Sequence, residues 1–265
     1  MRTRILCLAL LVSSLPGLAA ENWILVWSDE FNGAAHTSPD PSKWTYDLGG
    51  GGWGNLELET YSKDPENVSE DGEGHLIIRA IRTASGGYTS ARIKTAGRFS
   101  VKYGKIAVRM KISSGQGLWP AFWMLGENIT TAGWPKCGEI DVMENIGKEP
   151  GIVHGTIHGP GYSGSKGIAH SYSLPDGQPL SADFHVYAVE WAADSITFLL
   201  DDHPYATVTP ASLPQGARWV YDHSFFLLVN LAVGGAWPGN PDTTTQFPQD
   251  LTVDWVRVWQ QADDR

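Results

Sequence analysis

The chain has 265 residues, of which 18% are charged and 42% hydrophobic, as in a globular protein of one or at most two domains. Its formal net charge of −10 argues against nucleic acids and anionic membranes as partners, because both attract basic surfaces. Its 30 Gly, 16 Pro and 12 Trp residues indicate many turns, and either a large aromatic core or a surface that stacks on flat ligands.

Residues 1–20 have the pattern of a secretory signal peptide: two early arginines, an apolar run, and small residues ending at Ala20. Pro16 interrupts the apolar run before it reaches the roughly 20 residues that a membrane-spanning helix needs. We therefore expect a secreted protein, extracellular or periplasmic, in which residues 21–262 form a single domain. Cys137 would be the one cysteine of the mature chain, which leaves no internal disulfide.

Alternation of apolar and polar residues predicts short β-strands along most of the chain. The predicted strands are 75–82, 105–113, 184–191, 195–202, 225–233 and 251–259. A helix was considered only near 210–222, because no long stretch keeps a 3.6-residue period. Many short strands separated by turn residues predict an antiparallel sandwich or barrel.

The segment LGGGGWGN, residues 48–55, is rich in glycine but lacks the Lys and Ser/Thr of a phosphate-binding loop. We interpret it as a surface loop that lets a ligand approach the backbone closely.

The segment CGEIDVMENIG carries three acids within six residues, Glu139, Asp141 and Glu144. On a strand, Glu139 and Asp141 share a face, and strict alternation sends Glu144 to the opposite face. A β-bulge near Val142 and Met143 would absorb one residue and return Glu144 to the first face. With such a bulge, all three acids converge.

Convergence would suit acid–base chemistry on a sugar. With the bulge counted out, Glu139 and Glu144 lie four strand positions apart, roughly 13 Å between Cα atoms. Side chains that reach toward each other bring the carboxyls to about 5 Å, the separation in retaining glycosidases. Asp141 between them would raise the proton affinity of a neighbour or share a proton with it. The alternatives are a solvated acidic strand and a Ca²⁺ site, although the spacing differs from that of an EF-hand loop.

The segment GEIDVMENIG resembles the signature of glycoside hydrolase family sixteen, most closely its laminarinase-type endo-β-1,3-glucanases. Other segments resemble family blocks in family order over nearly the whole mature chain. They are WSDEFNG (27–33), GGWGNLELETYS (51–62), YTSARIKT (88–95), GLWPAFWML (117–125), VHGTIHGPGYSG (153–164) and GGAWPGNPD (234–242). The resemblance implies an all-β fold, a β-jelly-roll sandwich of two antiparallel sheets with an open substrate cleft on the concave face.

The resemblance also implies roles for the acids, with Glu139 as nucleophile, Glu144 as general acid/base, and Asp141 orienting and tuning Glu139. It implies an endo-β-1,3-glucanase that hydrolyses laminarin-like β-glucans by retaining double displacement and needs no cofactor for the chemistry. We expect a monomer. The alternatives are a mixed-linkage β-1,3-1,4-glucanase or transglycosylase of the same family, or a non-catalytic β-glucan-binding protein. The intact pair of Glu residues argues against the binding protein.

Tryptophans in the family blocks are candidates for stacking on sugar rings. They are Trp119, Trp123, Trp134 and Trp237, with core packing an equal alternative for Trp123. Six others are assigned to packing: Trp23, Trp27, Trp44, Trp191, Trp255 and Trp259. Asn55 and Arg92 resemble family residues that hydrogen-bond sugar hydroxyls, and the alternative for Arg92 is a salt bridge to an acid. The pattern does not decide whether Glu57 or Glu59 enters the cleft.

His154 and His158 would share a strand face, but HGTIH lacks the Glu of the zincin motif and no third zinc ligand is obvious. We assign His158 to a cleft contact. Cys137 lies beside the acids without a Cys–His arrangement, so we interpret it as a packed residue.

The resemblance further implies a structural Ca²⁺ on the convex side. Its ligands would be the Asp254 side chain and the backbone oxygens of Glu30 and Gly74, an oxygen-only set that suits this ion. The alternative is that Asp254 caps strand amides without a metal.

Overall fold

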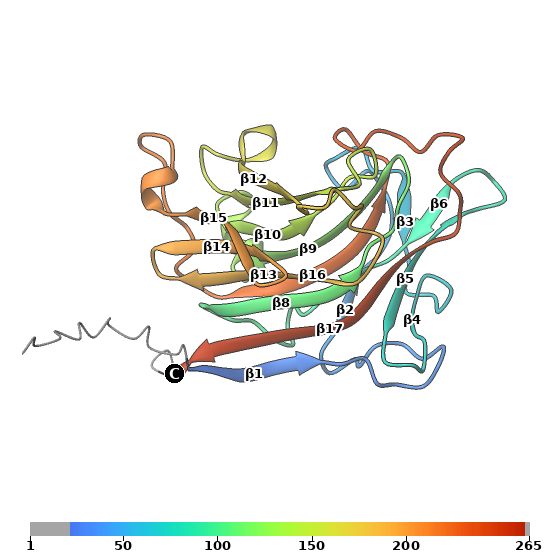
Figure 1. Ribbon diagram of the computed structural model, residues 1–265, viewed down its shortest axis with the longest axis horizontal. Coiled ribbons are helices and arrows are strands. Elements are labelled where there is room, and N and C mark those ends of the chain that lie inside the picture. Colours follow the sequence, from blue (N-terminus) through green and yellow to red (C-terminus); the bar gives the residue numbers. More distant parts are fainter. Residues whose placement is uncertain (1–21, 263–265) are drawn as a thin grey trace, which may run out of the picture.

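The structure of the protein is a computed structural model that describes residues 22–262. The predicted signal peptide lies outside the described residues. Two β-sheets pack against each other, and the start of β1 lies beside the end of β17, where Trp23 pairs with Gln261 (Figure 1). Within the described part of the chain, no helix combines the length and apolarity needed to cross a bilayer.

The larger sheet has ten of the described strands, in the order β15-β14-β13-β8-β17-β5-β6-β3, with β1 paired to β17 and β4 to β5. Their bounds are β1 Trp23–Asp29, β3 Glu59–Tyr61, β4 Val68–Glu70, β5 Leu76–Arg82, β6 Tyr88–Ser90, β8 Gly104–Lys111, β13 His185–Ala192, β14 Ser195–Leu200, β15 His203–Val208 and β17 Gln249–Gln261. All its pairs are antiparallel except β3 with β6.

The smaller sheet has seven of the described strands, in the order β12-β11-β10-β9-β16-β7-β2, all antiparallel. Their bounds are β2 Thr45–Asp47, β7 Arg92–Lys94, β9 Leu118–Gly126, β10 Glu139–Glu144, β11 Ile152–His158, β12 Ile168–Ser173 and β16 Phe225–Val233. Short helical segments are α1 Ile129–Ala132, η1 Gly164–Lys166 and η2 Pro210–Ser212.

The core lies between the two sheets and follows from the alternation. In β8, Ile106, Val108 and Met110 are fully buried, while Lys105 and Arg109 on the other face are partly exposed. Every residue of β16 is buried, because one face of this strand meets the core and the other lies under the side chains of the cleft described below. Burial of this apolar surface is the main force that holds the sheets together.

The structure confirms the predicted all-β sandwich and the six predicted strands, with ends that differ by at most two residues. The helix considered near 210–222 is wrong beyond one turn, since only Pro210–Ser212 is helical there. Pro214 cannot donate a backbone hydrogen bond, and Gly216 takes a positive φ of 81°, so the helix cannot continue.

The tryptophans assigned to packing do pack, to different degrees. Trp44 and Trp191 are 1% and 2% exposed in the core. Trp27 stacks on Phe99 at the edge of the core, with ring centroids 4.9 Å apart. Trp255 and Trp259 cover a second small cluster of buried residues, Ala107, Ala188 and Leu199. Trp23 on β1 is partly buried.

Candidate active site

Strand β10 contains the predicted bulge. In its pairing with β9, Asp141 lies opposite Trp123, while Met143, two residues on, lies opposite the very next partner, Phe122. Val142 is therefore the extra residue, and the predicted bulge is confirmed.

The bulge decides where the acids point. Glu139, Asp141 and Glu144 all line one cleft, whereas Val142 and Met143 are consecutive and both turn into the core, 1% and 0% exposed. If the same six residues alternated strictly, with no bulge, Glu144 would point into the core.

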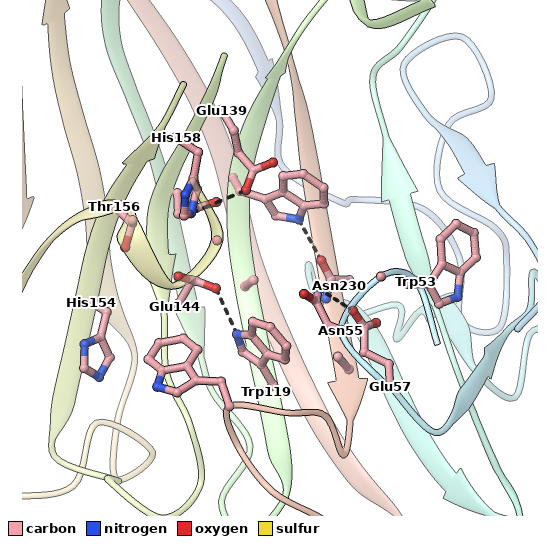
Figure 2. A pocket seen from close by; sticks show the side chains of 18 of the residues that line it. Trp53, Asn55, Glu57, Trp119, Glu139, Glu144, His154, Thr156, His158 and Asn230 are labelled. Atoms are coloured by element: carbon pink, nitrogen blue, oxygen red, sulfur yellow. Dashed lines mark hydrogen bonds and ion pairs between the residues drawn. The ribbon is translucent and has the colours of Figure 1, made fainter. Parts of the chain in front are cut away.

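The cleft has a volume of about 900 Å³ and crosses the smaller sheet from β7 to β12. Figure 2 shows Glu139, Glu144 and His158 on one side, and Asn55, Glu57 and Asn230 on the other. The structure brings together every residue that the sequence suggested for catalysis or substrate binding. These are Glu139, Asp141, Glu144, Asn55, Arg92, Trp119, Trp123, Trp134, His158 and Trp237.

Each glutamate is held by a different indole. Trp134 Nε1 donates to Glu139 Oε2 at 2.9 Å, and Trp119 Nε1 donates to Glu144 Oε1 at 3.0 Å. One carboxyl oxygen of each glutamate is thus fixed by an indole.

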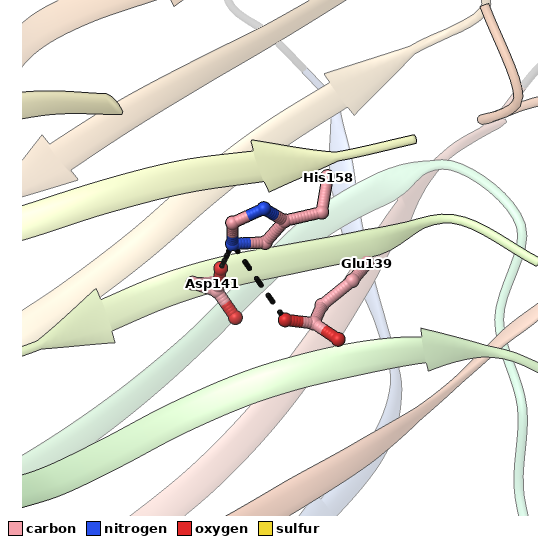
Figure 3. Close-up of side chains that lie close together, drawn as sticks. All are labelled: Glu139, Asp141 and His158. Carbon is pink, nitrogen blue, oxygen red and sulfur yellow. Dashed lines mark ion pairs between the residues drawn. The ribbon is translucent and has the colours of Figure 1, made fainter. Parts of the chain in front are cut away.

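Asp141 and His158 lie beside Glu139 (Figure 3). His158 Nε2 lies 3.1 Å from Asp141 Oδ2 and 3.8 Å from Glu139 Oε1. The ligand atoms of these three side chains lie within 4.8 Å of one another, so they are also a geometric candidate for a metal ion. The two histidines considered as zinc ligands have different partners, since His154 lies 3.3 Å from Glu149 and not beside the acids that His158 contacts.

Burial raises the pKa of all three acids. The pKa of Glu139 rises to about 8, with the charge of Asp141 adding to the effect of burial. Burial likewise raises the pKa of Asp141 to about 7. The pKa of Glu144 lies well above its ordinary value, because burial and the charges of Asp141 and Glu139 all oppose its ionisation. A proton retained on Glu144 is what a general acid requires.

Aromatic rings line both halves of the cleft. The Arg92 guanidinium lies 4.2 Å from the centroid of Trp53 and 5.7 Å from that of Trp123. Arg92 also has the alternative contact predicted for it, an acid, with Nε 3.4 Å from Asp47 Oδ2. Trp134, in the loop before β10, is 49% exposed, so its ring face is open to a flat ligand.

The other half of the cleft ends at Trp237, which is 37% exposed. Its ring packs edge-on against Trp119, at 5.5 Å, and against His154, at 5.0 Å. Trp237 therefore braces the indole that holds Glu144.

A model of the glycosyl hydrolases family 16 matches residues 56–257, which is well over half of the chain. The chain belongs to glycosyl hydrolase family 16. It is therefore a glycoside hydrolase, as the acid motif and the other family blocks predicted.

Similar proteins cover nearly the same length as this family 16 chain. It is 43% identical over 251 residues to a beta-glucanase of Rhodothermus marinus, an alignment that covers 91% of this chain and 86% of the relative. It is 46% identical to the laminarinase catalytic domain of Thermotoga maritima MSB8, with a TM-score of 0.84, covering 91% and 99% of the two chains. The endo-β-1,3-glucanase of Pyrococcus furiosus is 43% identical, with a TM-score of 0.85, over 95% and 99%. These structures confirm the predicted jelly-roll sandwich.

Several residues that line the family 16 cleft were not predicted as site residues, among them Trp53, Thr156 and Asn230. Of Glu57 and Glu59, between which the pattern does not decide, Glu57 lines the cleft and Glu59 lies beneath the surface. Asn230 had a usable signal, because it is the single polar residue in the apolar run FFLLVNLAV. The others become visible only when distant strands are brought together.

Cys137 is buried beside the acids. Burial, followed by the charge of Glu139, raises the pKa of its thiol to about 11, so the thiol stays protonated at neutral pH. This agrees with a packed residue and not with a nucleophile.

One predicted calcium ligand has another partner in the structure. The Asp254 carboxylate accepts a hydrogen bond from Arg109. Because Ca²⁺ takes about six to eight oxygen ligands, it would have to compete with Arg109 for the one carboxylate in the predicted set. The set of Asp254 with the backbone oxygens of Glu30 and Gly74 stays a prediction.

Proposed function

We propose that this chain is an endo-β-1,3-glucanase that hydrolyses laminarin-like β-glucans with retention of anomeric configuration. The observation that carries the proposal is the bulge at Val142, which sets Glu139 and Glu144 on the same face of β10 with Asp141 between them. On one strand face with one residue counted out, we expect the two carboxyls about 5 Å apart, the separation in retaining glycosidases, which favours a covalent intermediate over direct attack by water. The laminarinase and endo-β-1,3-glucanase names of similar structures support the substrate.

The chemistry divides between the two glutamates. Glu144 donates its proton to the glycosidic oxygen while a Glu139 carboxylate oxygen attacks the anomeric carbon, so the bond to the leaving sugar breaks as the glycosyl ester forms. Glu144, now a carboxylate, removes a proton from water, whose oxygen attacks the same carbon and releases Glu139. Two inversions at one carbon leave the β-configuration unchanged.

The neighbours of Glu139 prepare it for attack. Its Oε2 is fixed by Trp134, and its Oε1 lies 3.8 Å from His158. The charge of His158, when it is protonated, favours the ionised form of Glu139, while Asp141 opposes it. Asp141 and His158 thereby adjust the fraction of Glu139 that is ready to react.

The shape of the cleft supports internal cleavage. Trp53 and Trp237 line the same cleft as the acids, so a polysaccharide chain could lie across the site on both sides of the scissile bond. Secretion belongs to the same proposal, supported by the leader pattern of residues 1–20 and by a substrate too large to be taken up intact.

The test is to incubate the protein with laminarin, lichenan, agarose and xylan and to follow the anomeric protons by NMR in the first minutes. β-Anomers that appear first from laminarin would support both substrate and mechanism. α-Anomers first would overturn retention, and products from lichenan alone would move the substrate to mixed-linkage glucan.

Mutation of the nucleophile distinguishes an enzyme from a non-catalytic β-glucan-binding protein. Glu139→Ser should abolish product formation while laminarin binding persists. Tight laminarin binding without products from the unmutated protein would instead favour the non-catalytic alternative.

A further inference from the structure

The segment that leads into β3 has its polarity reversed. Leu56 and Leu58 point outward, 75% and 42% exposed, while Glu57, Glu59 and Tyr61 point inward, 8%, 1% and 1% exposed. Burying carboxyls in place of leucines costs free energy unless the carboxyls make compensating hydrogen bonds. The burial of these carboxyls therefore requires compensating interactions.

The Glu57 carboxylate accepts two hydrogen bonds, one at each oxygen. Asn55 Nδ2 donates to Oε1 at 3.0 Å, and Tyr61 OH donates to Oε2 at 3.1 Å. Asn55 lines the cleft itself, so the first bond fixes a side chain that faces the ligand directly (Figure 2).

The second bond continues from β3 of the larger sheet to a cleft residue on β16 of the smaller sheet. Asn230 Nδ2 donates to the Tyr61 hydroxyl at 3.3 Å, and Trp123 Nε1 donates to Asn230 Oδ1 at 2.7 Å. All donors in this arm point the same way, from Trp123 toward Glu57. Glu57 must be the acceptor at the end of this chain of hydrogen bonds, because each of the other groups donates its own hydrogen to the next group.

Glu59 lies beneath Glu57 in the same segment and is itself hydrogen-bonded. Its Oε2 accepts from the Val233 amide at 2.7 Å. Burial and the adjacent Glu57 carboxyl raise the pKa of Glu59 to about 8, so Glu59 is neutral at pH 7.

Arg92 lies against both aromatic rings of the arm that leads to Trp123. Its guanidinium lies 4.6 Å from the Tyr61 ring centroid and 5.7 Å from that of Trp123. A change in the direction of either ring would move this cation, which also lines the cleft.

We propose that Glu57 is a positioning residue for glycan recognition, which orients Asn55 through one carboxylate oxygen and Trp123 through the other by way of Tyr61 and Asn230. This inference rests on the proposed function, because the ligand is taken to be a β-glucan chain lying over this half of the cleft. Glu57 would act on substrate binding and leave the bond-breaking step to Glu139 and Glu144.

Three variants test the arrangement. Glu57→Gln keeps the shape but replaces one acceptor by an NH₂ group, so one arm must break. Tyr61→Phe removes only the arm to Trp123. Glu66→Gln makes the same chemical change at an exposed site outside the cleft and serves as the matched control.

The kinetic readout is kcat and KM on laminari-oligosaccharides of increasing length. A hydrogen bond to a charged group supports about a 10-fold rise in KM for long substrates in Glu57→Gln, with kcat changed by less than about threefold. Tyr61→Phe should show part of this rise, and the double variant should be no worse than Glu57→Gln by more than about twofold. Thermal unfolding checks that each variant is folded.

A second readout needs no substrate. The indole N–H resonance of Trp123 in a ¹⁵N-labelled sample should shift in both Glu57→Gln and Tyr61→Phe and stay in place in Glu66→Gln. If Glu57→Gln matches the control in KM and in this resonance, the inference is wrong. Equal losses on short and long substrates, together with a lowered unfolding midpoint, would also overturn it in favour of a purely structural role. If the unmutated protein cleaves no laminarin, the proposed function fails, and the resonance alone decides whether Glu57 orients Trp123.

Discussion

Burial of Glu139 opposes the ionisation that its role as nucleophile requires, and the charge of Asp141 adds to this opposition. Burial and the Asp141 charge raise the pKa of Glu139 to about 8, yet the nucleophile must be ionised to attack. The raised pKa therefore moves the acidic limb of the kcat/KM profile to higher pH. Asp141→Asn removes the negative charge, so we expect that limb to move to lower pH, measured on laminarin between pH 4 and 9. A limb that stays in place or moves upward would contradict this account of Asp141, and Glu66→Gln should leave the profile unchanged.

Site residues were predictable from sequence where the chain itself brings them together. Glu139, Asp141 and Glu144 lie within six residues, so strand periodicity and one bulge suffice to place them. The hydrogen-bonded link from Glu57 to Asn230 spans 173 positions. It runs by way of β3 to β16, two strands that belong to different sheets. Neither periodicity nor spacing reports such a contact, because it arises only when β3 packs beside β16.

The bulge in strand β10 sets which way the acids face, and an insertion and a deletion in this strand can test that. Deleting Val142 removes the bulge but keeps regular alternation, so all three acids still face the cleft, and the loss of a core side chain should cost roughly 1–3 kcal/mol. Inserting Ala between Met143 and Glu144 turns Glu144 into the core, where a carboxyl lacks partners. We expect the deletion to retain measurable laminarin hydrolysis and the insertion to lose it and to unfold at lower temperature.

The contrast between these two variants is what counts. A folded deletion variant as inactive as the insertion would show that the bulge does more than set the facing of Glu144. An active insertion variant would show that the strand can absorb a second extra residue.

Elements differed in how well their sequences predicted them. Long strands such as β8 and β17 repeat the alternation often enough for the period to be read. Strands β2, β3, β4, β6 and β7 have three residues each, too few to establish any period, and none was predicted. In the segment that leads into β3 the pattern is also reversed, with leucines outward and acids inward, so the usual rule would have assigned the wrong face.

The molecule as a whole buries several acids whose pKa values are raised, and this links its stability to pH. A carboxyl whose pKa is higher in the folded state stabilises the fold below its unfolded pKa, near 4.5, and this stability is lost as pH rises through the folded value. For Glu59 that window runs from 4.5 to about 8. Glu139 and Asp141 act in the same direction, with pKa values of about 8 and about 7. We therefore expect the midpoint temperature of thermal unfolding to decrease as the pH is raised from 5 to 8.5.

Glu59 allows this prediction to be tested apart from the catalytic acids. Its side chain is 1% exposed, so forcing it to ionise should cost on the order of a few kcal/mol, at about 1.4 kcal/mol for each unit of pKa. Glu59→Gln cannot ionise, and its amide oxygen can still accept from the Val233 amide. We expect this variant to match the parent at pH 5 and to unfold roughly 5 °C higher at pH 8.5, measured by calorimetry. An equal shift at both pH values would mean that packing, not ionisation, sets the difference.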